Sequence, residues 1–388
     1  MRLKTLTDSI YSLRIEKLQN KLKENDLDLF VGYSSECEPA TSRYLTGFWP
    51  FFDFAAVLVP AQGNAALVTG GPESYEFAKT FSKSVNIYIN PLLVETSAPD
   101  WVPDVAGEDF SQILEKVCDR KPERIGLGNW NIFPFDLLED LKKASPQSEF
   151  LPADELLLNI QAIKQDEEIP YIIEAYKITE QALMSALNEA QVGKREWELE
   201  AKARSTMALL GAEGMPYPSW VCSGPNTMLS LCRSTERVIE KNDLVQLTIG
   251  TKYMGYCANM CRPFAIGKFP PQAKIMADVA LEAMNYVLET IKPGIESSSL
   301  FKGYYKILSK YGYQDHTLYG PAHGTGSSEV EGLWLAEKSN FTIKPNMLFN
   351  IDIWLSDNNY GLRFEDGILI TQSGVKELTS YRREVITL

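Results

Sequence analysis

The sequence predicts a protein of the α/β (α+β) class with two domains: a small α/β domain over residues 1–160 and a larger domain over residues 161–388. A chain of 388 residues is longer than one ordinary domain and suffices for two hydrophobic cores. Strand-like and helix-like segments alternate over the first 160 residues, which is typical of an α/β domain. A long amphipathic helix then begins near Glu168, and further helices and paired strands follow it.

Hydrophobic spacing predicts the elements of the first domain. Apolar residues from Ile10 to Leu22 recur every three or four positions and predict a helix over 8–25, and the apolar run 27–32 predicts a buried strand. The segment GNAALVTGG, residues 63–71, predicts a turn that enters another strand. A helix over 109–121, a short strand over 125–128 and a helix over 135–143 follow.

Glycine and proline limit the helices of the second domain. The helix from Glu168 is followed by one over about 194–210, which Gly211 and Gly214 stop. Helices are also predicted over 271–291 and 298–311, separated by the terminator Lys292-Pro-Gly294. Strands are predicted over 217–223, 243–249 and 253–264, with two more inside 347–371.

The two central strands carry an unusual set of side chains. Because side chains alternate between the faces of a strand, Gln246 and Thr248 share one face, as do Cys257, Asn259 and Cys261. Small polar and thiol groups in such a row suggest the lining of a site. A half-exposed antiparallel sheet with polar residues facing water would give the same pattern.

Composition restricts the partners that we expect. The net charge of −13 and the pI near 4.9 argue against nucleic acid and anionic membranes, which bind clustered Lys and Arg. No apolar run approaches the length that spans a bilayer, and the first residues do not resemble a signal peptide, so we expect a cytoplasmic protein with a small-molecule substrate. The six cysteines are expected to be free thiols.

Three segments together resemble a known family. They are the central strands, the loop GPAHGTGSSEVEG with His323, and the segment 347–371 with Asp352 and Glu365. Their order resembles the catalytic domain of the creatinase, prolidase and aminopeptidase P family, which has the pita-bread fold. The first domain, with its Thr-Gly-Phe48 segment, resembles the creatinase-type amino-terminal domain of that family. The resemblance implies a homodimer.

The resemblance also implies the positions of a metal site. Peptidases of the family hold two divalent ions with Asp, Asp, His, Glu and Glu, and the matching positions are Thr248, Asn259, His323, Asp352 and Glu365. Neither a threonine hydroxyl nor an asparagine carbonyl has the charge and bidentate reach of a carboxylate. We therefore expect no dinuclear centre, and either no metal or one divalent ion held by His323, Asp352 and Glu365, with Asn259 as a weak ligand.

Catalytic positions of the family are changed as well. Two histidines that stabilise the tetrahedral intermediate in the peptidases match Leu231 and Val330, which weakens the expectation of an Xaa-Pro aminopeptidase or dipeptidase. Two catalytic residues of creatinase match Leu231 and Cys261. Our main hypothesis is a hydrolase that cleaves a C–N bond of a small, cationic substrate, with His323, Asp352 and Glu365 handling protons or one metal. The alternatives are the Xaa-Pro peptidase and a catalytically silent pita-bread binding protein.

Several residues are predicted to contact the substrate, and each has a plainer interpretation. On the family pattern, the aromatic loop after Phe48 reaches the partner's site, although its aromatic residues would equally suit a hydrophobic core. Cys257 or Cys261 could be a nucleophile or a buried inert thiol. Arg363 could bind an anion or form a structural ion pair with Asp352. The predicted substrate-binding set is Trp354, Asn259, Thr248, Cys257, Arg363, Trp49, Phe52 and Asp53, and the predicted catalytic set is His323, Asp352, Glu365 and Cys261.

Overall fold

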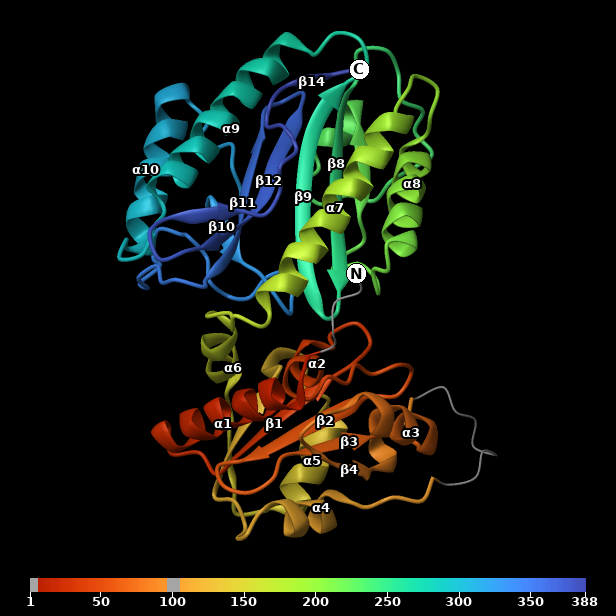
Figure 1. Ribbon diagram of the computed structural model, residues 1–388, viewed down its shortest axis with the longest axis vertical. Helices are drawn as coiled ribbons and strands as arrows, with labels where there is room; N and C mark the ends of the chain where they lie inside the picture. The colour runs from red at the N-terminus through yellow and green to blue at the C-terminus, as the bar shows by residue number, and fades with distance from the viewer. Residues whose placement is uncertain (1–5, 96–104) are drawn as a thin grey trace. The chain divides into compact units, whose positions relative to one another are not determined.

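The computed structural model describes residues 6–95 and 105–388, which form two compact units (Figure 1). The first unit ends at Gln161, and the second runs from Ala162 to Leu388. Each unit has hydrophobic cores of its own, because the buried clusters of the first unit involve only residues up to Ile160 and those of the second begin at Ile178.

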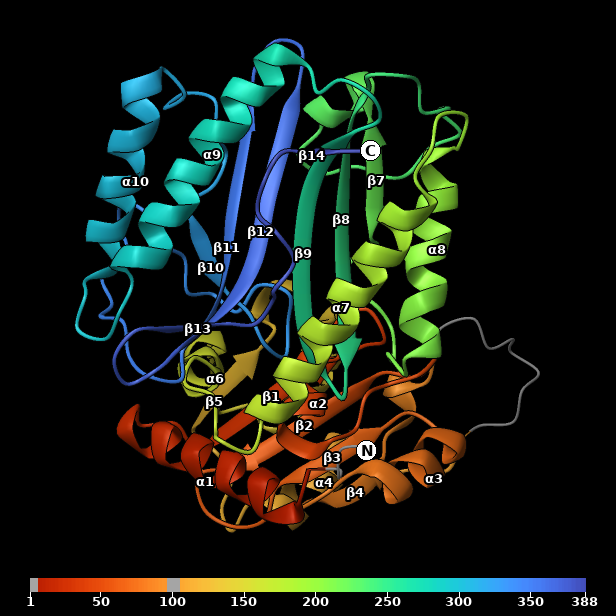
Figure 2. The same ribbon diagram turned by 45° about the horizontal axis from the view of Figure 1, so that its top comes forward.

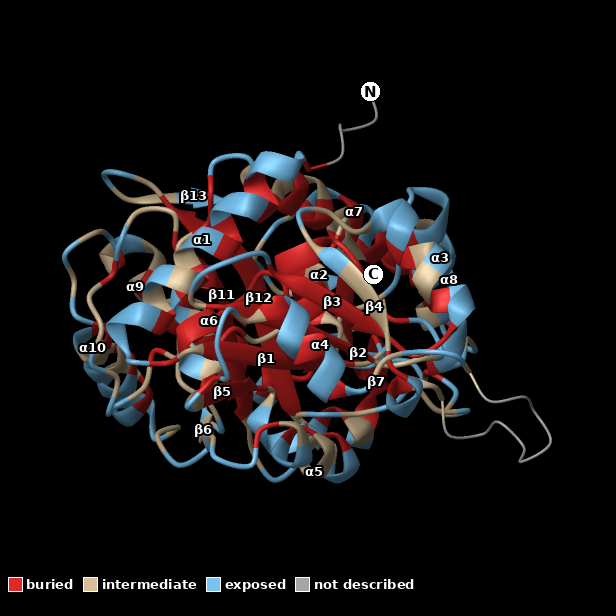
Figure 3. Ribbon diagram, turned by 90° about the horizontal axis from the view of Figure 1, so that it is seen from below, coloured by how far each residue is buried: buried red, intermediate tan, exposed pale blue. Residues whose placement is uncertain are grey.

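A mixed six-stranded sheet forms the centre of the first unit, in the order β4-β3-β2-β1-β5-β6. β1 pairs antiparallel with β2 and parallel with β5, so the unit is an α/β domain with a mixed sheet. β1, β2 and β3 are buried along their whole length (Figure 3). The strands are β1 (Leu29–Ser34), β2 (Ala55–Pro60), β3 (Ala66–Thr69), β4 (Asn86–Ile89), β5 (Arg124–Gly128) and β6 (Glu149–Pro152).

Helices cover this sheet, and one of them is shorter than the sequence suggests. They are α1 (Asp8–Glu24), α2 (Ala40–Thr46), α3 (Pro72–Phe81), α4 (Phe110–Val117), α5 (Phe135–Ala144) and α6 (Asp154–Gln161). We expected the fourth to extend to residue 121, but Cys118 is extended, with φ −113° and ψ 130°. Arg120 beyond it forms an ion pair with Asp28 at 2.7 Å, and Pro122 disfavours a helical residue before it.

An eight-stranded sheet forms the centre of the second unit (Figure 2). Its main order is β10-β11-β12-β9-β8-β7, and β13 and β14 pair with β12 and β9. α7 (Ile169–Glu189) and α9 (Pro271–Thr290) lie across the sheet, with α8 (Glu196–Leu209) and α10 (Ser297–Tyr311) beside them. The strands are β7 (Trp220–Ser223), β8 (Leu244–Tyr253), β9 (Tyr256–Ala265), β10 (Ala322–Gly324), β11 (Leu348–Ser356), β12 (Gly361–Ile370), β13 (Val375–Glu377) and β14 (Ile386–Thr387).

The central hairpin differs from our expectation at its turn. We placed the turn at residues 250–252, whereas β8 continues to Tyr253 and pairs directly with Tyr256. Met254 and Gly255 have φ values of 51° and 86°, as the two central residues of a type I′ turn require. Gly250 lies inside β8, and a glycine is needed there because a Cβ would be 2.8 Å from the Tyr217 ring.

The two faces of this sheet differ in character. Alternate residues such as Ile351 and Phe364 join the core against α9, and Leu247 and Met260 join the core with α7. The opposite face carries the polar and thiol groups. Among the residues that the structure describes, no helix is both long and apolar enough to cross a membrane.

Candidate functional site

A row of directly paired residues crosses the polar face of the sheet. Asp352 pairs with Glu365, Glu365 with Cys261, and Cys261 with Thr248, so four adjacent strands each contribute one side chain. Asn259 lies two residues from Cys261 and therefore on the same face. These five residues are at most 5% exposed, so this is not a sheet with one face in water.

Three potential metal ligands converge beside this row. His323 comes from β10, Glu365 from β12 and Glu329 from the loop after β10, and one ligand atom from each lies within 4.8 Å of the other two. His323 Nε2 is 3.7 Å from Glu329 Oε1 and 4.0 Å from Glu365 Oε1. The other ring nitrogen, Nδ1, lies 3.0 Å from the Gly324 carbonyl oxygen, which can only accept a hydrogen bond. In the neutral imidazole Nδ1 therefore carries the hydrogen, and the lone pair of Nε2 faces the two carboxylates.

Burial perturbs both carboxyl groups of this cluster. Burial and the nearby charge of Asp352 raise the pKa of Glu365 well above its ordinary value, against the opposing effect of Arg363. Burial also raises the pKa of Glu329, although His323 acts in the opposite direction. Two carboxyl groups and an imidazole lone pair at this distance are unfavourable together unless a proton or a cation lies among them.

Glu329 was absent from our predicted site, although the loop sequence contains two glutamates. Glu331 is buried and is bound by the Lys164 ammonium and the Ser327 backbone N–H, so its carboxylate is already satisfied. Glu329 instead lies toward the site, where Asn259 Nδ2 donates to its Oε1 at 3.4 Å. The family pattern directed attention to five fixed positions, and this loop residue lies outside them.

Asp352 forms an ion pair with Arg363, which was one of the two interpretations of that arginine. Its Oδ2 accepts from Arg363 Nη1 at 3.1 Å, and the two side chains are each 7% exposed. Asp352 is not part of the cluster of His323, Glu329 and Glu365, and a contact of Arg363 with an anionic substrate group stays a prediction. The Arg363 guanidinium also lies near two aromatic rings, 5.9 Å from the Trp220 centroid and 5.7 Å from that of Tyr319.

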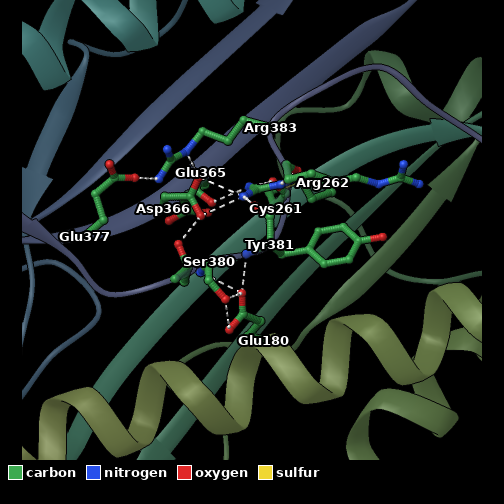
Figure 4. A network of polar contacts seen from close by, with 11 residues as sticks. Glu180, Cys261, Arg262, Glu365, Asp366, Glu377, Ser380, Tyr381 and Arg383 are labelled. Atoms are coloured by element: carbon green, nitrogen blue, oxygen red, sulfur yellow. Dashed lines mark hydrogen bonds and ion pairs between the residues drawn. The ribbon is translucent and has the colours of Figure 1, made fainter.

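A second buried arginine, on the opposite face, fixes the two middle strands at this point. Arg262 donates to the carbonyl oxygens of Cys261 and Glu365 and to both carboxylate oxygens of Asp366 (Figure 4). Arg262 and Asp366 are fully buried. Asp366 also accepts from Arg383, which ties the carboxy-terminal segment to β12. Because Glu365 and Cys261 precede this pair on their strands, the ion pair holds their backbones in register.

Buried polar atoms without partners accumulate on the polar face. No residue within 6–95 or 105–388 supplies a hydrogen-bond partner for these atoms. Such groups are costly when they stay unpaired, so we infer that a ligand, an ion or water satisfies them. The atoms are Oε2 of Glu365, Oδ1 of Asp352 and Asn259, Oε1 of Gln246, Nε1 of Trp220 and Trp354, the Tyr217 hydroxyl and Nε of Arg363.

Cys257 and Cys261 do not have the environment of a nucleophile. Burial raises the pKa of Cys257 to about 12, and it raises that of Cys261 further. The Cys261 sulfur lies 3.2 Å from the Thr248 hydroxyl, so this side of the row is neutral. We therefore replace the predicted catalytic role of Cys261 with that of a buried inert thiol.

The predicted aromatic loop belongs to the first unit. Trp49 packs under the Arg43 guanidinium, which lies 3.9 Å from its ring centroid. Asp53 accepts from the Ser74 hydroxyl at 2.7 Å and from the Glu95 backbone N–H, which is a structural role. Phe52 is 68% exposed, so it is not part of a core. A contact of Phe52 with a substrate stays a prediction, as does the homodimer.

The two changed histidine positions add no polar group to the site. Leu231 is 68% exposed, and Val330 is half-buried beside Glu329. Trp354 lies on the same face as Asp352 and pairs with Arg363 across the strands. Its indole nitrogen is one of the unpartnered donors named above.

Comparisons with known proteins cover nearly the whole chain. Residues 171–372 match the profile of metallopeptidase family M24, and residues 14–163 match the creatinase/prolidase N-terminal domain. An Xaa-Pro dipeptidase of Pyrococcus furiosus is 27% identical over 376 residues, 96% of this chain and 99% of its own length. A second, from Pyrococcus horikoshii, is 28% identical over 85% of this chain and 94% of its own. The crystal structure of the prolidase from Pyrococcus horikoshii OT3 has a TM-score of 0.83 and 26% identity, covering 96% of this chain and 100% of that one.

Proposed function

This chain belongs to metallopeptidase family M24 and carries the creatinase/prolidase N-terminal domain, and on that premise we propose that it hydrolyses a C–N bond of a short peptide with one divalent metal ion. The observation that carries the proposal is the convergence of His323, Glu329 and Glu365. The ligand set differs from the one that the family pattern suggested, because Glu329 replaces Asp352.

The residues of the cluster fit a divalent cation. One imidazole nitrogen and two carboxylates are the donors that zinc and similar ions bind in catalytic sites. His323 presents its lone pair because the Gly324 carbonyl holds the hydrogen on the other nitrogen, which is a common arrangement around metal ligands. Glu365 Oε2 and Asn259 Oδ1 are buried, and neither has a hydrogen-bond partner in the described part of the chain.

One ion fits this site better than two. Thr248 and Asn259 are neutral, and Asp352 is already paired with Arg363, so a second ion would lack an available carboxylate. A bound divalent ion supplies Lewis-acid polarisation of the scissile carbonyl and activation of water. The positions of Asp352 and Trp354 suit them to act on the substrate rather than on the metal.

The chain's own residues divide the remaining work. Asp352 is held through Oδ2 by Arg363, so the unpartnered Oδ1 is available to accept a proton from the attacking water or a hydrogen bond from a substrate amine. The Trp354 and Trp220 N–H groups and the Tyr217 hydroxyl are buried donors available to substrate oxygens. Arg262 maintains the alignment of the strands that carry these groups.

The comparisons support a peptide substrate over our main hypothesis of a small cationic one. Similar proteins of Pyrococcus are named Xaa-Pro dipeptidases, so dipeptides with proline in second position are the first substrates to test. The ion pair between Asp352 and Arg363 also removes one of the free carboxylates on which a cationic substrate would depend. The losses at Leu231 and Val330 predict slower turnover than in an enzyme with histidines at these positions.

The proposal is tested by metal analysis and a substrate panel. Protein purified without chelator is expected to hold about one divalent ion per chain, and His323→Ala and Glu329→Gln are expected to lower the metal affinity at least tenfold. Glu337→Gln is the matched control, because this glutamate is exposed on the same segment, outside the cluster. Hydrolysis is measured with Xaa-Pro and Xaa-Gly dipeptides in the presence of Mn²⁺, Co²⁺ or Zn²⁺.

Three outcomes would contradict the proposal. Two tightly bound ions per chain would mean that neutral side chains suffice for a second site. Unchanged affinity in Glu329→Gln would exclude this glutamate from the ligand set. A protein that binds no metal and cleaves no dipeptide would support the alternative of a silent binding protein.

A further inference from the structure

Tyr176 occupies an unusual place in the second unit. It belongs to α7, is fully buried, and lies against Gly367 of β12. A Cβ at position 367 would be 2.1 Å from Cζ of the Tyr176 ring, so only glycine leaves room for the ring. The tyrosine thus reaches past β12 from the helix side of the sheet, two residues from Glu365 along the strand.

The Tyr176 side chain contacts two strands of the sheet. Its hydroxyl donates to Oδ1 of Asn350 on β11, and its ring lies against Gly367 of β12. Because the amide carbonyl oxygen can only accept, the hydroxyl proton is directed to Asn350. This contact fixes which end of the Asn350 amide faces the tyrosine.

The orientation of Asn350 then determines the environment of Glu365. With Oδ1 toward Tyr176, the Asn350 Nδ2 donates to Glu365 Oε1 at 3.2 Å. Glu365 Oε2 keeps no partner among the described residues. A reversed amide would direct a carbonyl oxygen at the carboxylate and repel it. Tyr176 therefore selects the amide orientation that leaves one Glu365 oxygen held and the other available.

We propose that Tyr176 is a positioning residue that, through Asn350, holds Glu365 in the orientation that binds the metal ion. The inference rests on the proposed function, because it concerns the ligand set of His323, Glu329 and Glu365. Tyr176 itself touches neither ion nor substrate. Asn350 is the direct partner of Glu365, and removal of such a partner typically changes metal affinity 10- to 100-fold, which sets the scale for the loss of the Tyr176 hydroxyl that holds Asn350.

The test is Tyr176→Phe, which keeps the ring beside Gly367 and removes only the hydroxyl. Co²⁺ is the probe, titrated into metal-free protein and followed by its visible absorption. We expect roughly 10- to 100-fold weaker binding and an altered absorption spectrum of the bound ion. Tyr304→Phe is the matched control, because Tyr304 is also fully buried and its hydroxyl is hydrogen-bonded to Thr317 at 2.8 Å, outside the metal cluster.

A double variant separates positioning from simple packing. In an Asn350→Leu background the route from Tyr176 to Glu365 is already broken, so Tyr176→Phe is expected to weaken Co²⁺ binding no further. Equal Co²⁺ affinity and spectrum in wild type and Tyr176→Phe would overturn the inference. An effect of Tyr176→Phe that is as large in the Asn350→Leu background would also overturn it.

A metal-independent measurement distinguishes this inference from the proposed function. Crystal structures of metal-free wild type and Tyr176→Phe are expected to show the Asn350 amide and the Glu365 carboxylate in different positions or in more than one conformer in the variant. An unchanged Glu365 carboxylate would overturn the inference. Wild-type protein that binds no Co²⁺ would overturn the proposed metal site, and the two crystal structures would still decide the role of Tyr176.

Discussion

The ion pair between Arg363 and Asp352 offers a direct test of how charge is balanced beside the cluster of His323, Glu329 and Glu365. The two side chains are each 7% exposed, and the N–O distance is 3.1 Å. Replacing Arg363 with methionine leaves the Asp352 carboxylate buried without its cation, while Oδ1 already has no partner among the described residues. Breaking a buried pair on one side costs about 3–5 kcal/mol.

The double variant Asp352→Asn with Arg363→Met should recover much of this loss. It removes the charge as well as its partner, so we expect it to be about 2–3 kcal/mol more stable than the sum of the two single changes predicts. Since the chain has two compact units, urea unfolding of the whole chain is combined with hydrogen exchange of peptides from β12, which reports the local stability of this sheet. Wild type and the three variants are compared at pH 7 without metal.

Additive free energies in this cycle, or a loss below about 1 kcal/mol in Arg363→Met, would contradict this prediction. Either result would mean that water or a rearranged side chain reaches Asp352. The carboxylate would then be free to bind a cation, and our original hypothesis of a cationic substrate would regain support. A large coupling free energy between the two changes would instead mean that Arg363 neutralises the charge of Asp352.

Three further predictions concern the same sheet. Because burial raises the pKa of Glu365 well above 4.5, the folded protein retains a proton that the unfolded chain loses. The free energy of unfolding of the metal-free protein should therefore fall as pH rises from about 4.5 through the folded pKa. In Glu365→Gln, urea unfolding should show a smaller change of this free energy with pH. Gly367→Ala should cost about 1–3 kcal/mol in urea unfolding, and much less when Tyr176 is alanine, because the added Cβ meets that ring. Cys257 and Cys261 should resist a thiol reagent in the native protein, whereas the exposed Cys37 should react; rapid labelling of Cys261 would contradict its burial.

The sequence predicted the parts of this sheet that depend on the alternation of side chains along a strand and on the spacing of the motifs. The period of two placed Gln246 with Thr248 on their strand and Asn259 with Cys261 on theirs, and the structure adds that Thr248 pairs directly with Cys261, so that the two sets share one face. His323 and Glu365 were predicted to converge, and they do. The turn after Gly250 was misplaced because glycine serves there to admit the Tyr217 ring, and a packing requirement leaves no periodic signal.

Contacts between distant segments could not be predicted in the same way. The fit of Tyr176 against Gly367 joins a helix to a strand nearly two hundred positions later, and neither residue belongs to a motif. Likewise, the loop offers both Glu329 and Glu331, and only the buried partner of Glu331, Lys164, shows which carboxylate is already engaged. Sequence proximity to His323 alone does not distinguish them.

The distribution of charge across the sheet determines where a cation can bind. On β8 and β9 the side chains of the row are those of Thr248, Asn259 and Cys261, none of which is a carboxylate that attracts an ion. On β12 and in the loop after β10, Glu365 and Glu329 lie on either side of His323, and Arg363 already neutralises Asp352. A cation is therefore attracted toward the β10 and β12 side, away from the central hairpin. The single metal ion that we propose depends on this asymmetry, because the acidic groups free to hold it lie on one side of the sheet.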